Sequence, residues 1–353
     1  MRKNIYNFSV FKFFLLFLLY ISLIIFNCSI QDNSNGKGDE GEDEDDNSNI
    51  IYKQYMRSFV QNISTWAKAQ KTGFIIIPQN GHELATIDGD NNGPPNTAYI
   101  AAIDGAGQED LFFGYNNDDE ATPTVERDYL LDFLNIYEDN GVEVLVTDYC
   151  STVSNMNDSY TQNASRGFIS FAADHRELDN IPGYPTNPYN ENTFNIITLS
   201  NAKNFLYLLN PDTTVYTSKA DFVSAIDTTN YDVILIDLYY YDNSGTEFEL
   251  DITDINNLKT KPSGSSRLVI CYMSIGEAED YRYYWDTSWE TNPPEWMAEE
   301  NPDWPGKYKV RYWYTEWQDI IFGNNSSYLQ KIIDAEFDGV YLDIIDAFEY
   351  FED

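Results

Sequence analysis

The chain has 353 residues, of which 42% are hydrophobic and 16% aromatic, and its 58 acidic against 21 basic side chains give a net charge of −37. So many aromatic rings exclude a mainly disordered chain, and so few basic residues exclude a nucleic-acid binder, because phosphates require a basic surface. The only two histidines, His82 and His175, make a multi-histidine metal site or a histidine-centred hydrolase improbable.

The N-terminus has the features of an export signal. Arg2 and Lys12 precede or border an apolar run over residues 13–26, which is too short for a comfortable membrane span. A cysteine shortly after this run resembles a bacterial lipoprotein signal, with residues 1–27 as the signal and Cys28 as the lipidated residue. This predicts an exported protein, anchored in the membrane by lipid at the cell envelope or surface. The alternative is an uncleaved anchor, which gives nearly the same location.

Residues 28–49 follow as an acidic spacer. From Gln31 to Asn49 the sequence contains no apolar residue and carries many like charges that repel one another. Such a segment cannot bury a core, so it is predicted to be a disordered tether without chemistry of its own. The folded domain is therefore predicted to span residues 50–353.

Within this domain, short apolar runs alternate with helical patterns. Runs that are apolar throughout are typical of parallel strands that are covered by helices on both faces. Eight such strands predict a (β/α)₈ TIM barrel, an α/β fold, and a ninth candidate implies that one of the nine is peripheral. An open, doubly wound sheet is the alternative. The predicted strands are 74–77, 99–103, 143–147, 205–209, 233–237, 268–273, 309–313 and 339–343, with 168–172 as the ninth, and the predicted helices are 54–71, 126–138, 219–227, 251–259 and 326–335.

Cys150 and Cys271 lie in apolar, strand-like contexts. We predict two buried free thiols, since a free cysteine behaves as a small apolar side chain. A disulfide between them in an oxidising compartment is the alternative.

Polar side chains follow strand after strand. In a barrel the carboxyl ends of the strands converge on one mouth, so these side chains are expected to line a single acidic cleft. One Asp after a strand is commonly a helix cap, but several like charges close together cost stability and require another reason. An acidic cleft with Tyr and Trp around it suits carbohydrate, because carboxylates perform acid–base work on glycosidic bonds. The side chains are Gln79, Asn80, Asp104, Glu109, Asp148, Tyr149, Asp237, Glu277, Glu279, Asp343 and Asp346.

A subset of these residues is predicted to bind substrate hydroxyls or a protonated amine. Tyr281 starts a cluster of rings over 281–285, for which a sugar-stacking role and ordinary packing are both open. Arg282 and Arg311, rare cations in an acidic domain, are predicted to pair with carboxylates as structural struts. Neither a phosphate-binding loop nor a Cys-x-x-Cys pattern occurs, so no cofactor and no metal are expected. The predicted binding residues are Asp237, Glu277, Asn80, Asp148, Tyr149 and Tyr281.

Several long segments resemble glycoside hydrolase family 114, the endo-α-1,4-polygalactosaminidase-like TIM barrels. The resemblance covers residues 54–353, but the family's early segments lie late in this chain and its later segments lie early. The order predicts a circular permutation with a seam near residues 182–195. A mis-assembled reading frame or a fragment of a tandem repeat is the alternative. The resembling segments are 74–81, 103–112, 144–149, 272–285, 293–296, 301–306, 310–313, 317–318 and 337–347.

The resemblance implies a two-carboxylate mechanism, with Asp343 as the nucleophile and Glu109 as the acid/base, and therefore retention of configuration. It also implies an α-1,4-linked galactosamine polymer as the substrate. The acidity of the chain favours a cationic amino-sugar polysaccharide over a polyanion, although the charge can equally serve solubility alone. The alternative function is a non-catalytic, carbohydrate-binding surface lipoprotein on a glycosidase-like barrel, since a fold does not fix function.

Overall fold

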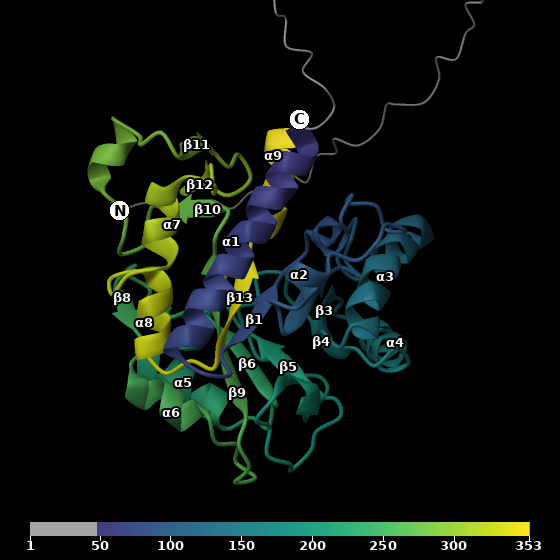
Figure 1. Ribbon diagram of the computed structural model, residues 1–353. Coiled ribbons are helices and arrows are strands. Elements are labelled where there is room, and N and C mark those ends of the chain that lie inside the picture. Colours follow the sequence, from purple (N-terminus) through teal and green to yellow (C-terminus); the bar gives the residue numbers. More distant parts are fainter. Residues whose placement is uncertain (1–47, 353) are drawn as a thin grey trace, which may run out of the picture. The chain divides into compact units, whose positions relative to one another are not determined.

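Parallel strands form the centre of the part of the chain that the structure, a computed structural model, describes, which is residues 48–352 (Figure 1). The predicted signal over residues 1–27, the lipidation site Cys28 and the tether as far as residue 47 lie outside these residues. The first helix begins at Ser48, two residues before the predicted start of the domain.

Eight parallel strands form two sheets. At one edge, a parallel bridge between Gln79 and Gly107 joins β1 to β2, and at the other, a bridge between Ser170 and Asn204 joins β4 to β5. This mixed α/β arrangement is compatible with a TIM-barrel-like fold. The five-stranded sheet has the order β1 (Ile75–Pro78), β13 (Gly339–Asp343), β9 (Leu268–Ser274), β6 (Val233–Ile236) and β5 (Phe205–Tyr207), and the three-stranded sheet has the order β2 (Gly105–Glu109), β3 (Glu143–Tyr149) and β4 (Ile169–Ala173).

Helices alternate with most of these strands, and their ends follow capping rules. The Ser218 side chain accepts a hydrogen bond from the backbone N–H of Asp221, and Asp251 and Asp254 form a capping box. Both devices satisfy N–H groups that a helix start leaves unpaired. The helices are α1 (Ser48–Gln70), α2 (Thr97–Ile100), α3 (Thr124–Asp139), α4 (Val153–Ala164), α5 (Lys219–Asp227), α6 (Ile252–Leu258), α7 (Thr315–Ile321), α8 (Tyr328–Asp334) and α9 (Phe348–Glu352), with 3₁₀ turns η1 (His82–Ala85), η2 (Leu199–Asn201), η3 (Thr287–Glu290) and η4 (Ile345–Ala347).

Two small antiparallel units follow the carboxyl ends of β6 and β9. The hairpin of β7 (Tyr239–Tyr241) and β8 (Glu247–Glu249) comes after β6. After β9 the chain forms a three-stranded sheet with the order β10 (Glu277–Glu279), β12 (Lys307–Val310) and β11 (Met297–Glu300). The three-stranded sheet lies at the upper left of Figure 1, and it contributes Lys307 to the site described below.

The predicted strand 99–103 is wrong. Residues 97–100 are helical, because the Asn96 side chain caps α2 by accepting from the N–H of Tyr99. The true strand is β2, whose low hydrophobicity hid it from an apolar pattern. Its glycine at position 107 is required sterically, since a Cβ there would lie 2.0 Å from the Tyr341 hydroxyl oxygen.

The peripheral member of the nine predicted strands is 309–313. Residues 307–310 form β12 of the antiparallel sheet, whereas the ninth candidate, 168–172, corresponds to β4 of the parallel sheet. The predicted seam, residues 182–195, contains neither helix nor strand and connects β4 to the segment before β5.

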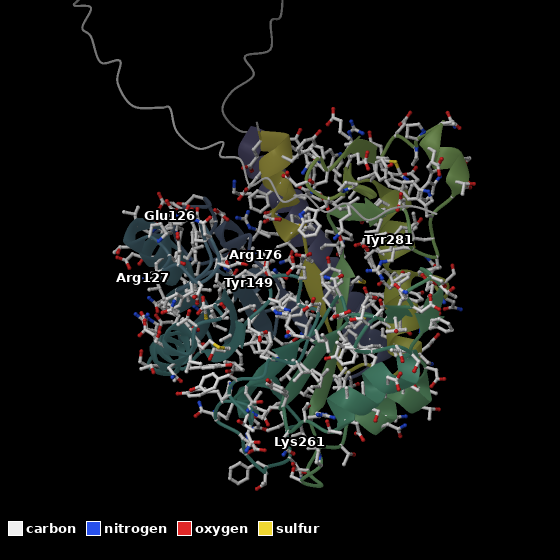
Figure 2. All side chains as sticks on the ribbon, turned by 180° about the vertical axis from the view of Figure 1, so that it is seen from behind. Glu126, Arg127, Tyr149, Arg176, Lys261 and Tyr281 are labelled. Atoms are coloured by element: carbon white, nitrogen blue, oxygen red, sulfur yellow. The ribbon has the colours of Figure 1, made fainter. Side chains whose placement is uncertain are left out.

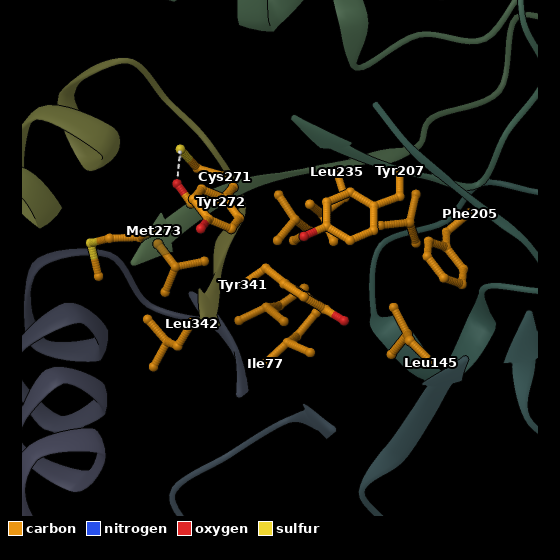
Figure 3. Close-up of a cluster of buried hydrophobic side chains, with 14 of the residues drawn as sticks. Ile77, Leu145, Phe205, Tyr207, Leu235, Cys271, Tyr272, Met273, Tyr341 and Leu342 are labelled. Carbon is orange, nitrogen blue, oxygen red and sulfur yellow. Dashed lines mark hydrogen bonds between the residues drawn. The ribbon is translucent and has the colours of Figure 1, made fainter. Parts of the chain in front are cut away.

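Side chains from several strands fill the space between the sheets. Figure 3 shows Tyr207 and Tyr341 beside Ile77 and Leu145, and the two tyrosine rings lie 5.5 Å apart. All four of these residues are at most 2% exposed. Burial of apolar area on this scale is the main stabilising contribution to such a fold.

Both described cysteines, Cys150 and Cys271, are buried and free, which confirms the prediction of two free thiols.

Candidate active site

Three neighbouring strands, β13, β1 and β2, end in polar side chains and then turn sharply. The residue after each of these side chains is not glycine and yet has a left-handed backbone, which is uncommon. Such strain persists only where the surrounding structure enforces it, and it is frequent at functional sites. The three pairs are Asp343 with Ile344 (φ 58°), Gln79 with Asn80 (φ 59°) and Glu109 with Asp110 (φ 62°).

Close packing enforces the turn after β13. A Cβ on Gly276 would lie 2.1 Å from the carbonyl oxygen of Ile344, so only glycine fits beside this turn. A Cβ on Gly81 would lie 3.0 Å from the side chain of Ile345. The backbone that carries Asp343 is therefore fixed on both sides.

Glu109 is held by two donors. The Tyr149 hydroxyl donates to one carboxylate oxygen, and the Gln79 side-chain amide donates to the other. Burial raises the pKa of Glu109 to about 7, the hydrogen bond from Tyr149 opposes this shift, and the charge of Asp343 adds to it. Glu109 and Asp343 thus lie close enough to interact electrostatically. The predicted binding residue Asn80 accepts from the N–H of Glu109 at 3.3 Å and so supports this carboxylate.

Asp343 has neighbours that favour its charged form. The Tyr272 hydroxyl donates to its Oδ2 at 2.6 Å. Burial raises the pKa of Asp343, whereas the hydrogen bond from Tyr272 and the positive charge of Lys307 lower it. Tyr272 lies on the adjacent strand β9, and Lys307 comes from β12 of the small antiparallel sheet.

A third carboxyl group lies two residues beyond the turn. Burial and the charges of Asp343 and Glu349 raise the pKa of Asp346 to about 8. Asp346 is therefore mostly neutral at pH 7, which reduces the repulsion that three adjacent carboxylates would otherwise create.

Arg282 confirms the prediction of a structural strut. Its guanidinium binds both oxygens of Asp237, at 2.8 and 2.6 Å, and its Nε donates to Glu279. Arg282 is only 4% exposed. Asp237, predicted to bind substrate, therefore has both oxygens engaged with this arginine. Arg311 was predicted to pair with a carboxylate, and this prediction is wrong. Its guanidinium donates to the backbone carbonyls of Glu295 and Met297.

Asp148 is fully buried. Burial raises its pKa to about 6, although four hydrogen bonds lower it. Its position speaks against the predicted role in substrate binding, since the protein already occupies both oxygens. The donors are the N–H groups of Phe112 and Phe113, the Ser159 hydroxyl and the Asn163 amide.

Two further predicted strand-end acids have different positions. Glu277 is 1% exposed, and its Oε1 accepts from Asn301 at 2.7 Å while its Oε2 has no hydrogen-bond partner among the described residues. Asp104 precedes β2 instead of following a strand. Its carboxylate pairs with Lys68 and accepts from the N–H of Ile76, so it lies at the opposite end of the strands from Glu109.

Arg176 is a member of the site that sequence reasoning missed. Its guanidinium lies 4.0 Å from the centre of the Tyr149 ring and 3.0 Å from Asp110, and it donates to Asp118 at 2.6 Å. Figure 2 shows Arg176 next to Tyr149, with Tyr281 on the other side of the view. Arg176 thus fixes the tyrosine that donates to Glu109. The only sequence signal was the rarity of basic residues in an acidic chain.

Among residues 48–352, no helix is both long and apolar enough to cross a membrane. Over the same residues, no three His, Cys, Asp or Glu side chains are grouped in a way that could hold a metal ion.

Comparison with known proteins links the C-terminal half of the chain to a family. The model of glycoside-hydrolase family GH114 matches residues 190–353. An uncharacterized protein of Methanocaldococcus jannaschii is 42% identical over 188 residues, which are 52% of this chain and 49% of the relative. An uncharacterized protein of Thermotoga maritima is 58% identical over 23% of this chain and 24% of its own length. An uncharacterized protein of Deinococcus radiodurans is 34% identical over 36% of this chain and 37% of its own length.

The chain thus spans about half the length, or less, of the curated relatives that it matches. The family match over residues 190–353 supports a relationship to glycoside hydrolase family 114.

Proposed function

We propose that this protein is a glycoside hydrolase in which Asp343 is the nucleophile and Glu109 the general acid/base. One observation carries the proposal: two interacting carboxyl groups stand at the ends of strands that flank β1, and they have different neighbours. Burial raises the pKa of both groups, that of Glu109 to about 7, and at Asp343 the Tyr272 hydrogen bond and the Lys307 charge oppose the shift. A difference in surroundings between two carboxyl groups is how acid and base roles are divided at one site.

In the first step, Glu109 donates its proton to the glycosidic oxygen while a carboxylate oxygen of Asp343 attacks the anomeric carbon. The bond between this carbon and the leaving oxygen breaks, and the leaving oxygen keeps the electron pair and the proton. In the second step, water attacks the same carbon, Glu109 takes the proton of the water, and Asp343 leaves as a carboxylate. Two displacements retain the configuration, and this mechanism requires carboxyl groups about 5–5.5 Å apart.

We propose an α-1,4-linked galactosamine polymer as the substrate. The family resemblance supports this choice, and so does the net charge of −37, because negative potential raises the local concentration of a cationic polymer. This substrate would be supported if the enzyme preferred the amine-bearing to the acetylated polymer and if this preference faded with added salt. Salt weakens the attraction because the Debye length shortens to about 3 Å at 1 M. A preference for the acetylated polymer would leave the acidity as a solubility feature.

We also propose that the eight parallel strands close into a circularly permuted barrel. In support, strand neighbours follow chain order all the way around, with β13 paired to β1 and single bridges at the two sheet edges. The family match begins at residue 190, inside the proposed seam. The export signal and the lipid anchor at Cys28 remain part of the proposal, and labelling with a radioactive fatty acid in wild type and Cys28→Ala would test the anchor.

The experiment that tests the function measures reducing ends released from polygalactosamine. Asp343→Asn and Glu109→Gln should each lower kcat by about a thousandfold or more, since removing one member of a catalytic set is severe. The matched control is Glu316→Gln, an exposed glutamate on α7 that should retain full activity. NMR of the first product should show retained configuration. Full activity in Asp343→Asn would contradict the proposal, and binding without hydrolysis in the wild type would favour the non-catalytic carbohydrate-binding alternative.

A further inference from the structure

The loop between β11 and β12 presents a large ring to solvent. Trp304 is 59% exposed, and Tyr281, which follows β10, is 42% exposed. Exposed rings are common one at a time, but a rigid, grouped pair beside a site is a feature of binding surfaces.

The loop that carries Trp304 is firmly anchored. At its start, the Asn301 side chain donates to the buried Glu277 at 2.7 Å. At its end, the N–H of Asp280 donates to the carbonyl of Gly306 at 2.8 Å, and a Cβ on Gly306 would lie 2.8 Å from the Asp280 carboxylate. Both ends of the loop are thus hydrogen-bonded to β10 or to the residue that follows it. The Trp304 ring is therefore exposed on a well-anchored loop.

One ion pair connects the two rings. The Lys307 ammonium lies 5.3 Å from the centre of the Trp304 ring and 3.5 Å from Oε1 of Glu279. The Tyr281 hydroxyl donates to this same oxygen, and its ring packs edge-on against Tyr241 at 5.8 Å. Trp304 therefore contacts the lysine, and Tyr281 the glutamate, of a single ion pair.

This ion pair also acts electrostatically on the proposed nucleophile. Lys307 lowers the pKa of Asp343 and Glu279 raises it, so both charges act on that carboxylate. The topology agrees, because β10 directly follows β9, whose last residue Ser274 pairs in register with Asp343. The rings consequently belong to the surroundings of the reacting pair.

We propose that Trp304 and Tyr281 form a sugar-binding subsite that takes a pyranose unit of the polysaccharide next to the units at the reacting pair. This inference rests on the proposed function. The rings would cover the apolar faces of the sugar, and the Lys307 ammonium would bind its hydroxyl groups. Rigid rings lose little conformational freedom on binding, so they suit this task.

The chemistry of the surface favours a sugar over a protein partner. Two rings around one ion pair offer far less than the roughly 800 Å² that each partner buries in a stable protein interface. An entirely apolar ligand would remove solvent from the partly exposed lysine, which costs free energy. A pyranose has apolar faces and polar edges, and it satisfies both parts of the surface.

The test compares substrates of two lengths with the whole protein. Trp304→Ala should lower kcat/KM on polygalactosamine by about tenfold, the effect expected of one lost ring contact. On the disaccharide, which is too short to reach both the reacting pair and the rings, the loss should be much smaller. Trp304→Phe should restore most of the activity on the polymer. Phe194→Ala, which removes a ring that is 75% exposed in the segment before β5, is the matched control and should behave as wild type.

A binding measurement separates the subsite from the reaction. Polygalactosamine and its acetylated form are titrated calorimetrically into the Asp343→Asn variant. Both should bind more weakly to the double variant that also carries Trp304→Ala. Suppose that the wild type cleaves the polymer and that Trp304→Ala lowers kcat/KM equally on polymer and disaccharide, or on neither. The subsite is then overturned and the proposed function stands. If the wild type cleaves neither polymer but Trp304→Ala weakens binding, the subsite stands and the hydrolase is overturned. Binding that does not depend on Trp304 overturns the subsite in either case.

Discussion

Glu109 and Asp343 show how the same functional group acquires different properties from its neighbours. Both are strand-end carboxyl groups whose pKa is raised by burial. Glu109 meets neutral donors from Tyr149 and Gln79, whereas Asp343 meets a hydroxyl and the positive charge of Lys307. The protonation states therefore depend on residues that lie far from both in sequence.

Tyr149 should set the alkaline limit of activity. Its hydrogen bond lowers the pKa of Glu109, so Tyr149→Phe should raise that pKa above about 7 and move the alkaline limb of kcat/KM to higher pH. The maximal rate should also fall, because the carboxyl group loses a partner that orients it. The pH profile of kcat/KM on the disaccharide measures this. An alkaline limb that stays in place or moves to lower pH would contradict the role of Glu109.

Lys307 should set the acid limit. Its charge lowers the pKa of Asp343, so Lys307→Met should raise this pKa and move the acid limb of kcat/KM to higher pH. Lys307→Arg keeps the charge and should restore the wild-type limb. A purely structural role for Lys307 would lower activity at every pH without moving the limb, and that result would refute the prediction.

Among the elements, continuous apolar runs and amphipathic periods were sufficient for most of the fold. The pattern over 219–227 predicts α5 with the bounds that the structure gives, and the runs at 233–237 and 339–343 coincide with β6 and β13 within a residue. Sequence reasoning failed at β2, where Gly105 and Gly107 replace the apolar residues that mark other strands. The second of these glycines is required by a ring from β13, a contact that no local pattern contains.

Gly107 offers a test of this contact. A Cβ there would lie 2.0 Å from the Tyr341 hydroxyl oxygen, so Gly107→Ala should force β2 away from β13 and lower the free energy of unfolding by about 1–3 kcal/mol. Gly183→Ala is the matched control, since nothing lies within 4 Å of the position that its new methyl group would take, and it should leave stability unchanged. Chemical denaturation of both variants measures the difference. Equal stability of the two would disprove the steric argument.

The candidate site was only partly within reach of the sequence. Strand-end position selected Glu109, Asp343 and Gln79 correctly as members of one neighbourhood, because parallel strands end on the same side. It could not separate them from Asp148, whose carboxylate is occupied by backbone N–H groups. Arg176 escaped notice because its contact with Tyr149 depends on how two loops meet.

At the scale of the described molecule, buried carboxyl groups should make stability fall as the pH rises. The pKa values of Glu109 and Asp346 are raised to about 7 and about 8, so the native state binds more protons than the unfolded chain between pH 6.5 and 8.5. Stability is then lost as the pH rises through these values. His82, whose pKa burial lowers, opposes this trend near pH 6.5, because the unfolded chain there binds more protons at this histidine than the native state does.

The thermal midpoint should therefore be higher at about pH 6.5 than at about pH 8.5. Asp346→Asn removes one of the titrating groups and should flatten this dependence, while Glu316→Gln should leave it as in the wild type. Scanning calorimetry across the range measures both. A midpoint that rises with pH would contradict the proton-binding argument.

The pairing of β1 with β13 has a consequence for biosynthesis. Ile75 pairs with Gly339, so the first parallel strand leaves the ribosome 264 residues before its neighbour exists. At about 5–20 residues per second, β1 waits for tens of seconds with an open edge. Glu109 is likewise made early, 234 residues before Asp343. The nascent chain consequently depends on protection of that edge until β13 has been synthesised, and the reacting pair can assemble only after that point.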